Sequence, residues 1–369
     1  MRWESLRDQH DEPALFERTD VAPAPSAWAR GTGRAGLADP GPEPVLGGDG
    51  GDAVAVEIRA RSVINRVPGE AAVPFRWTVN PYRGCSHACV YCFARRTHEY
   101  LDLDSGHDFD SKIMVKVNAG ELLRRELADP RWAGEPIAMG TNTDPYQRAE
   151  GRYRLMPQII AALRDFANPF SVLTKGRLIL RDLDLLEQAA RVTDVGLAVS
   201  VGSLDEAVWR SAEPGTPRPA SRLDVVRRCA DRGLDCSVLM APILPGLTDS
   251  AEQIEATVAA IAESGAANVT PILLHLRPGA REWYMQWLAR EHPQLVPRYR
   301  ELYRRGAYAP KPYRDLVGGR VREAARRHGL LRPGSDDTPR HRPAPAAGSA
   351  PAVSDGGSAR GGEQLTLLQ

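Results

Sequence analysis

The sequence lacks any apolar run long enough to cross a membrane. A spanning helix needs about 20 consecutive apolar residues, and none of the 369 residues belongs to such a run. Met1 is not followed by the basic segment and short apolar core of a secretory signal peptide. We therefore expect a cytoplasmic protein with no membrane partner.

Cysteine is scarce, and its odd count does not suit a disulfide framework. The chain has 5 cysteines, whereas small secreted domains carry many in even numbers. Cys85, Cys89 and Cys92 are separated by only three and two residues. Clustered cysteines in a reducing compartment indicate metal ligation.

The positive and negative charges nearly cancel, to a formal net charge of +1. The net charge therefore identifies no partner. Hydrophobic (42%) and charged (26%) residues are ordinary for a globular protein, but many of the 30 Pro and 33 Gly gather near the two ends. We predict four parts, which are a mostly flexible lead (1–53), a folded α/β part (54–280), a basic helical C-terminal extension (281–332) and a disordered tail (333–369).

Between these ends, short β-rich runs alternate with longer helical patterns. This alternation is typical of βα units around a parallel sheet, and we expect an α/β fold, a full or partial (β/α) barrel of about six units. Its functional residues should follow the carboxyl ends of the strands. The expected strands are 77–80, 113–117, 137–140, 171–174, 195–201, 237–241 and 268–274, and the expected helices are 155–166, 183–190, 220–232, 250–262 and 281–290.

The three clustered cysteines directly follow the first expected strand. Thiolates are the usual ligands of iron–sulfur clusters, and three of them leave one iron of a cubane without a protein ligand. That iron is a place for a small molecule to bind. A zinc site, or a cluster completed by Cys229 or Cys236, is the alternative, although zinc ligands normally come in pairs. His87 lies inside the loop, and we expect it to be a polar neighbour rather than a ligand.

Polar side chains follow three later strands. Thr143 and Asp144 come after 137–140, Lys175 follows 171–174, and Ser200 lies in 195–201. Such residues can face a ligand at the edge of a parallel sheet. The ordinary interpretation of Thr143 and Asp144 is a capped turn, and that of Lys175 is a surface lysine. Glu213 and Arg222, further along the chain, would ordinarily form a surface ion pair.

The spacing Cys-x3-Cys-x-aromatic-Cys, with Tyr91 before the last cysteine, resembles the signature of the radical S-adenosylmethionine (SAM) superfamily. The resemblance implies a [4Fe–4S] cluster on Cys85, Cys89 and Cys92, completed by SAM, with Tyr91 near the adenine. It also implies that the reduced cluster cleaves SAM to a 5′-deoxyadenosyl radical, which takes hydrogen from a substrate.

Further segments resemble the spore photoproduct lyase-like branch of that superfamily. In that branch, a T-D-P-Y-Q-x-x-E segment lies by the SAM amino group, which implies a SAM contact for Thr143 and Asp144. A T-K segment lies by the SAM carboxylate, which implies one for Lys175, with Ser200 donating to the same ligand. An E-P-x-x-P-x-x-x-x-R segment implies that Glu213 and Arg222 lie near the sugar and carboxylate.

Within that branch, the overall resemblance is greatest to an actinobacterial group for which no substrate is established. It rests on three strings: NRVPG, FRWTVNPYRGCSHACVYCFAR and THEYLDLDSGHDFDSKI. Spore photoproduct lyases carry a hydrogen-donating cysteine just ahead of the T-D segment, where this chain has Thr141 and Asn142. O–H and N–H bonds are much stronger than S–H bonds, so we do not expect thymine-dimer repair by the same mechanism. The substrate and the catalytic residues stay unassigned.

The segment from Arg290 to Arg332 is basic, with 12 Lys or Arg against 4 Asp or Glu, and tyrosines are interleaved at positions 299, 303, 308 and 313. Cationic and aromatic side chains together indicate single-stranded nucleic acid as a partner. The alternative is a helical cap in which Leu295, Tyr299, Leu302 and Tyr303 pack on the barrel.

A radical SAM enzyme also needs a one-electron reductase, and we expect one of flavodoxin or ferredoxin type. The alternative from another functional class is a non-catalytic iron–sulfur electron carrier or a zinc-type nucleic-acid-binding module. An electron carrier needs a fourth protein ligand and has little use for the polar strand ends.

Overall fold

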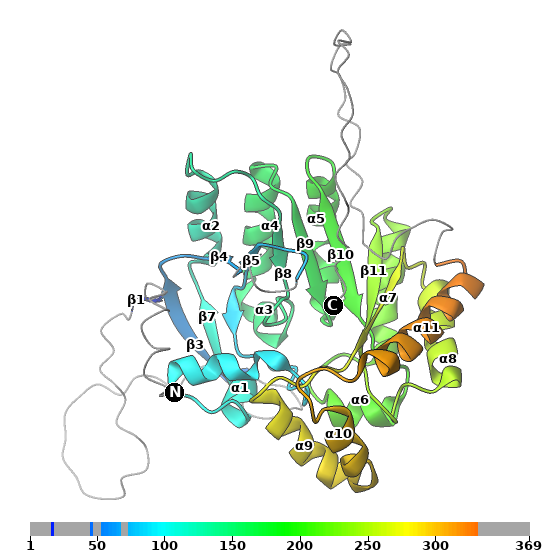
Figure 1. Ribbon diagram of the computed structural model, residues 1–369. Helices are drawn as coiled ribbons and strands as arrows, with labels where there is room; N and C mark the ends of the chain where they lie inside the picture. The colour runs from blue at the N-terminus through cyan, green and yellow to red at the C-terminus, as the bar shows by residue number, and fades with distance from the viewer. Residues whose placement is uncertain (1–15, 18–44, 47–52, 68–72, 331–369) are drawn as a thin grey trace, which may run out of the picture.

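The computed structural model describes residues 16–17, 45–46, 53–67 and 73–330. Its centre is a seven-stranded sheet in the order β12–β11–β10–β9–β8–β5–β4 (Figure 1). The first six are parallel neighbours, and β4 runs antiparallel to β5. Because β4 and β12 each have one neighbour among the described residues, the sheet is an open, partial barrel, as expected. The strands are β4 (Ile64–Arg66), β5 (Trp77–Val79), β8 (Ile137–Met139), β9 (Phe170–Thr174), β10 (Val195–Ser200), β11 (Cys236–Ile243) and β12 (Val269–Leu273).

Amphipathic helices connect the parallel strands and pack on the sheet through apolar stripes. In α4, the residues Ile159, Ile160 and Leu163 are fully buried, at the three- and four-residue spacing of one helix face. Ser250 and Gln253 form a capping box that starts α8. All five predicted helices are present: α4 (Leu155–Asp165), α5 (Leu183–Ala190), α7 (Pro219–Asp231), α8 (Ala251–Glu263) and α9 (Ala280–Glu291). Shorter helices that the sequence did not predict are α1 (His107–Ser111), α2 (Ala119–Leu127), α3 (Arg148–Tyr153), α6 (Glu206–Ala212), and the 3-10 helices η2 (Phe93–Leu101) and η3 (Arg177–Asp182).

One expected strand belongs to a second sheet. β7 (Lys112–Lys116) pairs in parallel with β3 (Ala53–Ala60) and antiparallel with β6 (Tyr82–Arg83), not with the main sheet. The β-rich pattern at 113–117 is a strand, as predicted, but the expectation that it joins the main sheet is wrong, because local periodicity does not specify a pairing partner. The strands β1 (Phe16–Glu17) and β2 (Val45–Leu46) also pair with β3. The rest of the predicted lead before Ala53, and the predicted tail 333–369, lie outside the described residues.

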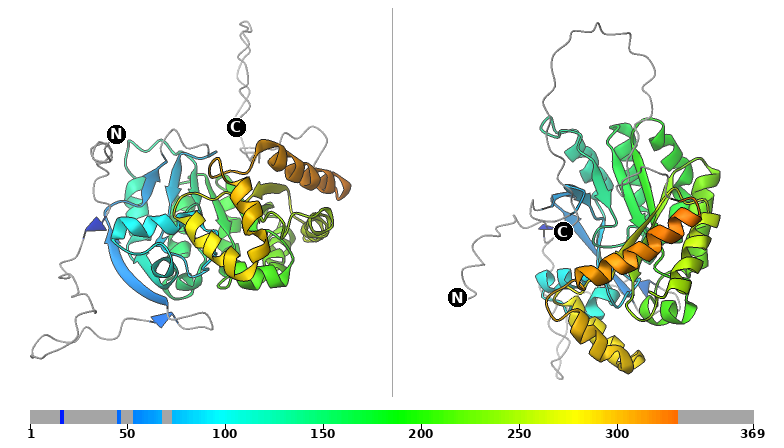
Figure 2. Two further views of the ribbon diagram at one scale, coloured as in Figure 1. Left: turned by 60° about the horizontal axis from the view of Figure 1, so that its bottom comes forward. Right: turned by 45° about the vertical axis from the view of Figure 1, so that its right-hand side comes forward.

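The C-terminal extension is helical and partly buried. After α9 come η4 (Pro293–Leu295), α10 (Val296–Leu302) and α11 (Lys311–Arg327), and α11 lies alongside α8 (Figure 2). Tyr299 and Tyr303 are buried, at 0% and 2% exposure, and pack with Tyr284 and Trp287. These two tyrosines are therefore not available to stack on bases. They form the apolar cap that was the alternative interpretation.

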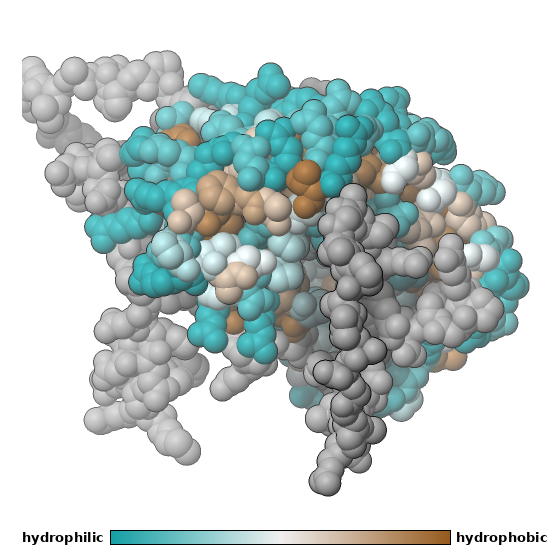
Figure 3. Space-filling model, turned by 90° about the horizontal axis from the view of Figure 1, so that it is seen from above, coloured by the Kyte–Doolittle hydropathy of each residue, from teal (hydrophilic) through white to brown (hydrophobic). Residues whose placement is uncertain are grey.

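No helix within the described ranges combines the length and the apolar character that a membrane crossing needs. The end of the molecule seen in Figure 3 is mostly hydrophilic where it is described, with apolar residues confined to smaller patches.

Candidate functional site

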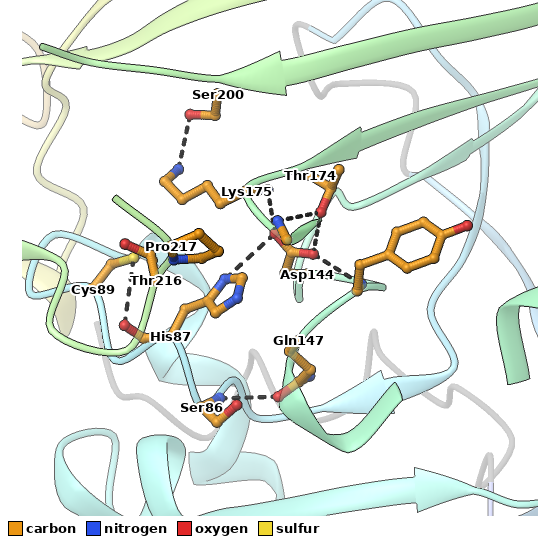
Figure 4. Close-up of polar contacts among 12 residues, drawn as sticks. Ser86, His87, Cys89, Asp144, Gln147, Thr174, Lys175, Ser200, Thr216 and Pro217 are labelled. Carbon is orange, nitrogen blue, oxygen red and sulfur yellow. Dashed lines mark hydrogen bonds and ion pairs between the residues drawn. The ribbon is translucent and has the colours of Figure 1, made fainter. Parts of the chain in front are cut away.

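The loop that carries Cys85, Cys89 and Cys92 is held in place by a side chain from another strand end. Gln147 donates from Nε2 to the carbonyl of Gly84 at 3.0 Å and accepts at Oε1 from the amide of Ser86 at 2.9 Å (Figure 4). Gly84 has a φ of +81°, and a Cβ there would lie 2.8 Å from the carbonyl oxygen of Lys112. Only glycine meets both requirements without strain.

A fully buried arginine supports the same loop. Arg95 donates from Nε and from one terminal nitrogen to the carbonyl of Cys89, at 3.2 Å and 3.0 Å. That terminal nitrogen also donates to Asp110 at 2.9 Å, and the other one donates to the carbonyl of Gly106 at 2.8 Å. The guanidinium also lies 4.8 Å from the ring centroid of Trp283. It therefore fixes the path of the backbone between the second and third cysteines.

Two of the three thiols are buried, those of Cys85 and Cys89, whereas Cys92 is half-buried. Burial, and then the negative charge of Asp144, raises the pKa of Cys85. Burial likewise raises the pKa of Cys89 to about 12, although the charge of Lys175 opposes the shift. For Cys92 burial again raises the pKa, and the nearby Arg95 opposes it. Thiols in such a place stay protonated unless a metal binds them as thiolates.

The donor set suits an iron–sulfur cluster. Three soft sulfur donors come from one loop, and the neighbouring imidazole of His87 is turned to Asp144 instead of joining them. Within the described residues, no three His, Cys, Asp or Glu side chains are close enough to hold a single metal ion. A cubane does not require that arrangement, because each cysteine binds a different iron.

A buried network next to the cysteine loop contains three of the predicted SAM residues. Tyr91 donates through its hydroxyl to Glu213, and Arg222 donates to the other carboxylate oxygen. Arg222 is 1% exposed, and it also donates to the carbonyl of Ser200 at 3.0 Å and to Thr216 at 2.6 Å. Burial would raise the pKa of Glu213, but the positive charges of Arg222 and Lys175 outweigh it and hold the pKa at about 2. Glu213 is therefore ionised at neutral pH.

Lys175 extends from the end of β9 across to the next strand. Its Nζ donates to Oγ of Ser200 at 2.8 Å and lies 5.8 Å from the ring centroid of Tyr91 (Figure 4). Ser200 in turn donates to the carbonyl of Ala241 at 2.8 Å. The ammonium therefore lies among the predicted ligands and donates its hydrogen bond to a neutral hydroxyl.

Thr143 and Asp144 make contacts within the protein. Thr143 donates through its hydroxyl to the carbonyl of Tyr82 at 3.0 Å. Asp144 accepts from Oγ1 of Thr174 and from the amide of Lys175, both at 2.6 Å. Its Oδ2 also lies 3.4 Å from Nδ1 of His87, whose pKa is lowered by burial. Asp144 thereby ties the cysteine loop to the end of β9.

The seven side chains predicted to contact SAM gather at one edge of the sheet, together with the three cysteines. Tyr91, Lys175, Ser200, Glu213 and Arg222 form one connected group. Thr143 and Asp144 adjoin it, but their polar atoms contact other parts of the protein. Three residues that were not predicted as site residues also support this group: Arg95, Gln147 and Thr216. Arg95 and Gln147 do so through hydrogen bonds to the backbone of the cysteine loop.

A small cavity adjoins the network. It has a volume of about 20 Å³ and is lined by Tyr91, Glu213, Arg222, Trp209 and Leu244, among others. This is room for roughly one water molecule. Trp209 donates a hydrogen bond from its indole to Thr216 at 2.9 Å. This bond holds the Trp209 side of the cavity against the network.

Both the sequence and the fold of the chain are similar to those of known proteins. The family model described as Radical SAM superfamily matches residues 79–260. Uncharacterised proteins of Mycobacterium tuberculosis and Mycobacterium bovis are 52% identical over 289 residues, which cover 78% of this chain and 83% of each relative. A protein of Methanocaldococcus jannaschii is 27% identical over 196 residues, covering 53% of this chain and 69% of that protein.

Among solved structures, spore photoproduct lyase complexed with dinucleoside spore photoproduct matches with a TM-score of 0.57 and 16% identity, over 74% of this chain and 79% of that chain. A double mutant of spore photoproduct lyase with bound AdoMet and dinucleoside spore photoproduct matches with a TM-score of 0.57 and 15% identity, over 75% and 79%. At these identities the likeness shows a shared fold.

Proposed function

The chain belongs to the radical SAM superfamily, and from this we propose that Cys85, Cys89 and Cys92 hold a [4Fe–4S] cluster with which the enzyme cleaves SAM reductively. The single observation that carries the proposal is the convergence of the three thiols of the cysteine loop, two of them buried, with Tyr91, Lys175, Glu213 and Arg222 at one sheet edge. A non-catalytic iron–sulfur protein or a zinc module would have no use for that charged group.

When bound, the reduced cluster supplies the electron that cleaves SAM to methionine and a 5′-deoxyadenosyl radical, which takes a hydrogen atom from the substrate. The protein provides the binding surface and excludes water. Arg95 and Gln147 hold the backbone of the cysteine loop, so that the three sulfurs keep their positions. The burial of the loop keeps solvent away from the thiolates.

We assign the remaining predicted residues to SAM. Lys175 is a cation with a neutral partner at Ser200, which suits the SAM carboxylate. The charge of Arg222 is neutralised by its ion pair with Glu213. The pair therefore offers ordered hydrogen-bonding atoms to the sugar and carries no net charge. Tyr91, held by the same glutamate, offers its ring to the adenine. Thr143 and Asp144 act beside the SAM amino group, where Thr143 is tied to the carbonyl of Tyr82 and Asp144 places the end of β9.

The test is anaerobic reconstitution with iron and sulfide, reduction in the presence of SAM, and chromatography for 5′-deoxyadenosine. We expect the wild-type chain to form 5′-deoxyadenosine and the Cys89→Ala variant to form none. Cys229→Ala is the matched control, because Cys229 is fully buried in the main core. A cluster that forms but whose electron paramagnetic resonance signal is unchanged by SAM, with no cleavage, would replace this proposal with the electron-carrier alternative.

Two partners belong to the proposal. A flavodoxin- or ferredoxin-type reductase would supply the electron, since none of the described residues is itself a low-potential donor. Nucleic acid would contact the basic C-terminal segment, through its arginines and Tyr308, since Tyr299 and Tyr303 are buried.

A further inference from the structure

Three aromatic rings and two guanidinium groups form a row directly after the cysteine loop. The ring centroid of Phe93, which follows Cys92, lies 5.7 Å from that of His275, and the ring of His275 lies 5.7 Å from that of Tyr308. The Cζ of Arg277 is 5.6 Å from the centre of the Phe93 ring, and that of Arg314 is 5.8 Å from the centre of Tyr308. We call these five residues the aromatic ladder.

The ladder joins segments that are far apart in the sequence. Phe93 begins η2, His275 follows β12, and Tyr308 precedes α11. A backbone bridge pairs His275 with Tyr308, and the amide of Leu276 donates to the carbonyl of Ala307 at 2.7 Å. The rings are therefore held by backbone hydrogen bonds and not only by contact with one another.

Burial does not explain why these rings lie in a row. Phe93 is 38% exposed and Tyr308 is 53% exposed, so both present aromatic surface to solvent. Arg277 and Arg314 each lie within the ~6 Å reach of a cation–π contact with the neighbouring ring, and the exposed fractions of the two rings leave surface open for a further contact. Within the described residues, neither Arg277 nor Arg314 forms an ion pair with a carboxylate, and Nε of Arg314 is buried without a hydrogen-bond partner. Rings and cations are thus both left with unused binding capacity.

A positively charged cavity lies next to the ladder. Its volume is about 140 Å³, and it is lined by Leu276, Arg281, Met285, Tyr299, Arg300, Tyr303 and Arg304. Leu276 is the neighbour of His275 in the chain. Of the three arginines, only Arg304 has a carboxylate partner within the described ranges, Glu301 at 2.9 Å. Nε of Arg281 is buried with no partner.

We propose that the aromatic ladder and this cavity bind single-stranded nucleic acid as the substrate. Aromatic and guanidinium faces stack on bases, and arginines without carboxylate partners neutralise phosphates. An acidic polypeptide would satisfy the charges but would leave the rings unused. The inference rests on the proposed function, because Phe93 directly follows Cys92, so a strand stacked on Phe93 would lie beside the loop that would hold the cluster.

The experiment measures fluorescence anisotropy of short labelled oligodeoxyuridylate and oligouridylate on the reconstituted full chain, without SAM or reductant. We expect Tyr308→Ala to weaken binding roughly five-fold to one-hundred-fold, the loss of one base-stacking contact, and Tyr308→Phe to bind as the wild type does. Tyr100→Ala is the matched control, since Tyr100 is 80% exposed on η2 and lies outside the ladder.

Salt dependence tests the arginines. Arg277→Gln should reduce the slope of log affinity against log salt concentration by roughly 0.7, the value for one phosphate contact on a single strand. Arg125→Gln, an exposed arginine on α2, should leave the slope unchanged. Oligodeoxyuridylate compared with oligouridylate decides between DNA and RNA, because these two differ only in the 2′-hydroxyl.

The inference is overturned if the wild-type chain binds neither oligonucleotide, if Tyr308→Ala binds as tightly as wild type, or if polyglutamate competes as well as the oligonucleotides do. Binding and SAM cleavage are measured separately. Cleavage without binding counts against the ladder alone, and binding without cleavage counts against the proposed function alone.

Discussion

Arg95 donates two hydrogen bonds to the backbone carbonyl of Cys89, from Nε at 3.2 Å and from a terminal nitrogen at 3.0 Å. The arginine lies three residues beyond Cys92, so the chain turns back beneath its own cysteines. The guanidinium is fully buried, and Asp110 is its carboxylate partner. Its planar fork holds several acceptors at fixed directions, which an ammonium group does not do.

We expect Arg95→Lys to lower the free energy of unfolding by roughly 3 kcal/mol, because it breaks a buried charge network, and to lower the iron bound after reconstitution. The control is Arg96→Lys, an exposed neighbour whose contact is with Glu99 and which should change neither quantity. Urea unfolding of the apo chain and an iron assay of the reconstituted chain measure the two effects. Iron content equal to wild type in Arg95→Lys would show that the loop does not depend on this arginine.

Gly215 joins the cysteine loop to the segment that carries Glu213. Its amide donates to the carbonyl of His87 at 3.1 Å, and a Cβ on it would lie 2.0 Å from the carbonyl oxygen of Ser86. We therefore expect Gly215→Ala to separate the two segments, with a loss of SAM affinity measured by equilibrium dialysis on the reconstituted chain. Gly319→Ala is the control, because this helical glycine has no positive φ and its Cβ would meet nothing within 4 Å. Equal SAM affinity in both variants would mean that the segments tolerate separation.

The sequence predicted the strand and helix positions well, because each leaves a local pattern. Apolar runs followed by short polar residues also located Lys175 and Ser200 at the strand ends. Pairing is different, since nothing within 113–117 says that β7 joins β3 instead of the main sheet.

Supporting residues escaped prediction for the same reason. Gln147 acts on Ser86, 61 residues away in the chain. The T-D-P-Y-Q-x-x-E segment contains this glutamine, but the local sequence does not specify which backbone groups it contacts. The interleaved tyrosines left two interpretations open, contact with bases or packing in a cap, because the burial of each ring depends on distant contacts. Tyr299 and Tyr303 are buried, whereas Tyr308 lies after α10 has ended and is exposed.

Glu213 should make the stability of the apo chain pH-dependent in acid. Its pKa is lowered from 4.5 to about 2 in the folded chain, so it stabilises the fold above the unfolded-state value. That contribution, on the order of 3 kcal/mol, is lost as the pH falls from about 5 through the folded-state pKa. We expect the difference in unfolding free energy between wild type and Glu213→Gln to be large at pH ~6 and to shrink towards pH ~3. A difference that stays constant over this range would show that Arg222 does not hold the carboxylate ionised.

Cys229 and Cys236 decide between a three-cysteine and a four-cysteine cluster. Cys229 lies in α7 and Cys236 begins β11, and both are buried in the main hydrophobic core. A hydrogen bond with Cys236 lowers the pKa of Cys229. Cys85 and Cys92 of the loop pack instead with Ala94 and Phe109. Each core thiol therefore acts as a small apolar side chain with the other as its neighbour.

We expect Cys229→Ala and Cys236→Ala to retain the iron content of wild type, at a cost of about 1 kcal/mol in unfolding free energy from the lost packing, whereas Cys92→Ala loses the cluster. Iron and sulfide assays on all three reconstituted variants, with urea unfolding of their apo forms, measure this. Loss of iron in either core variant, without a matching loss of stability, would mean that the cluster has a fourth protein ligand. In that case no iron would be open to SAM, and the three-thiol argument would fail at its first step.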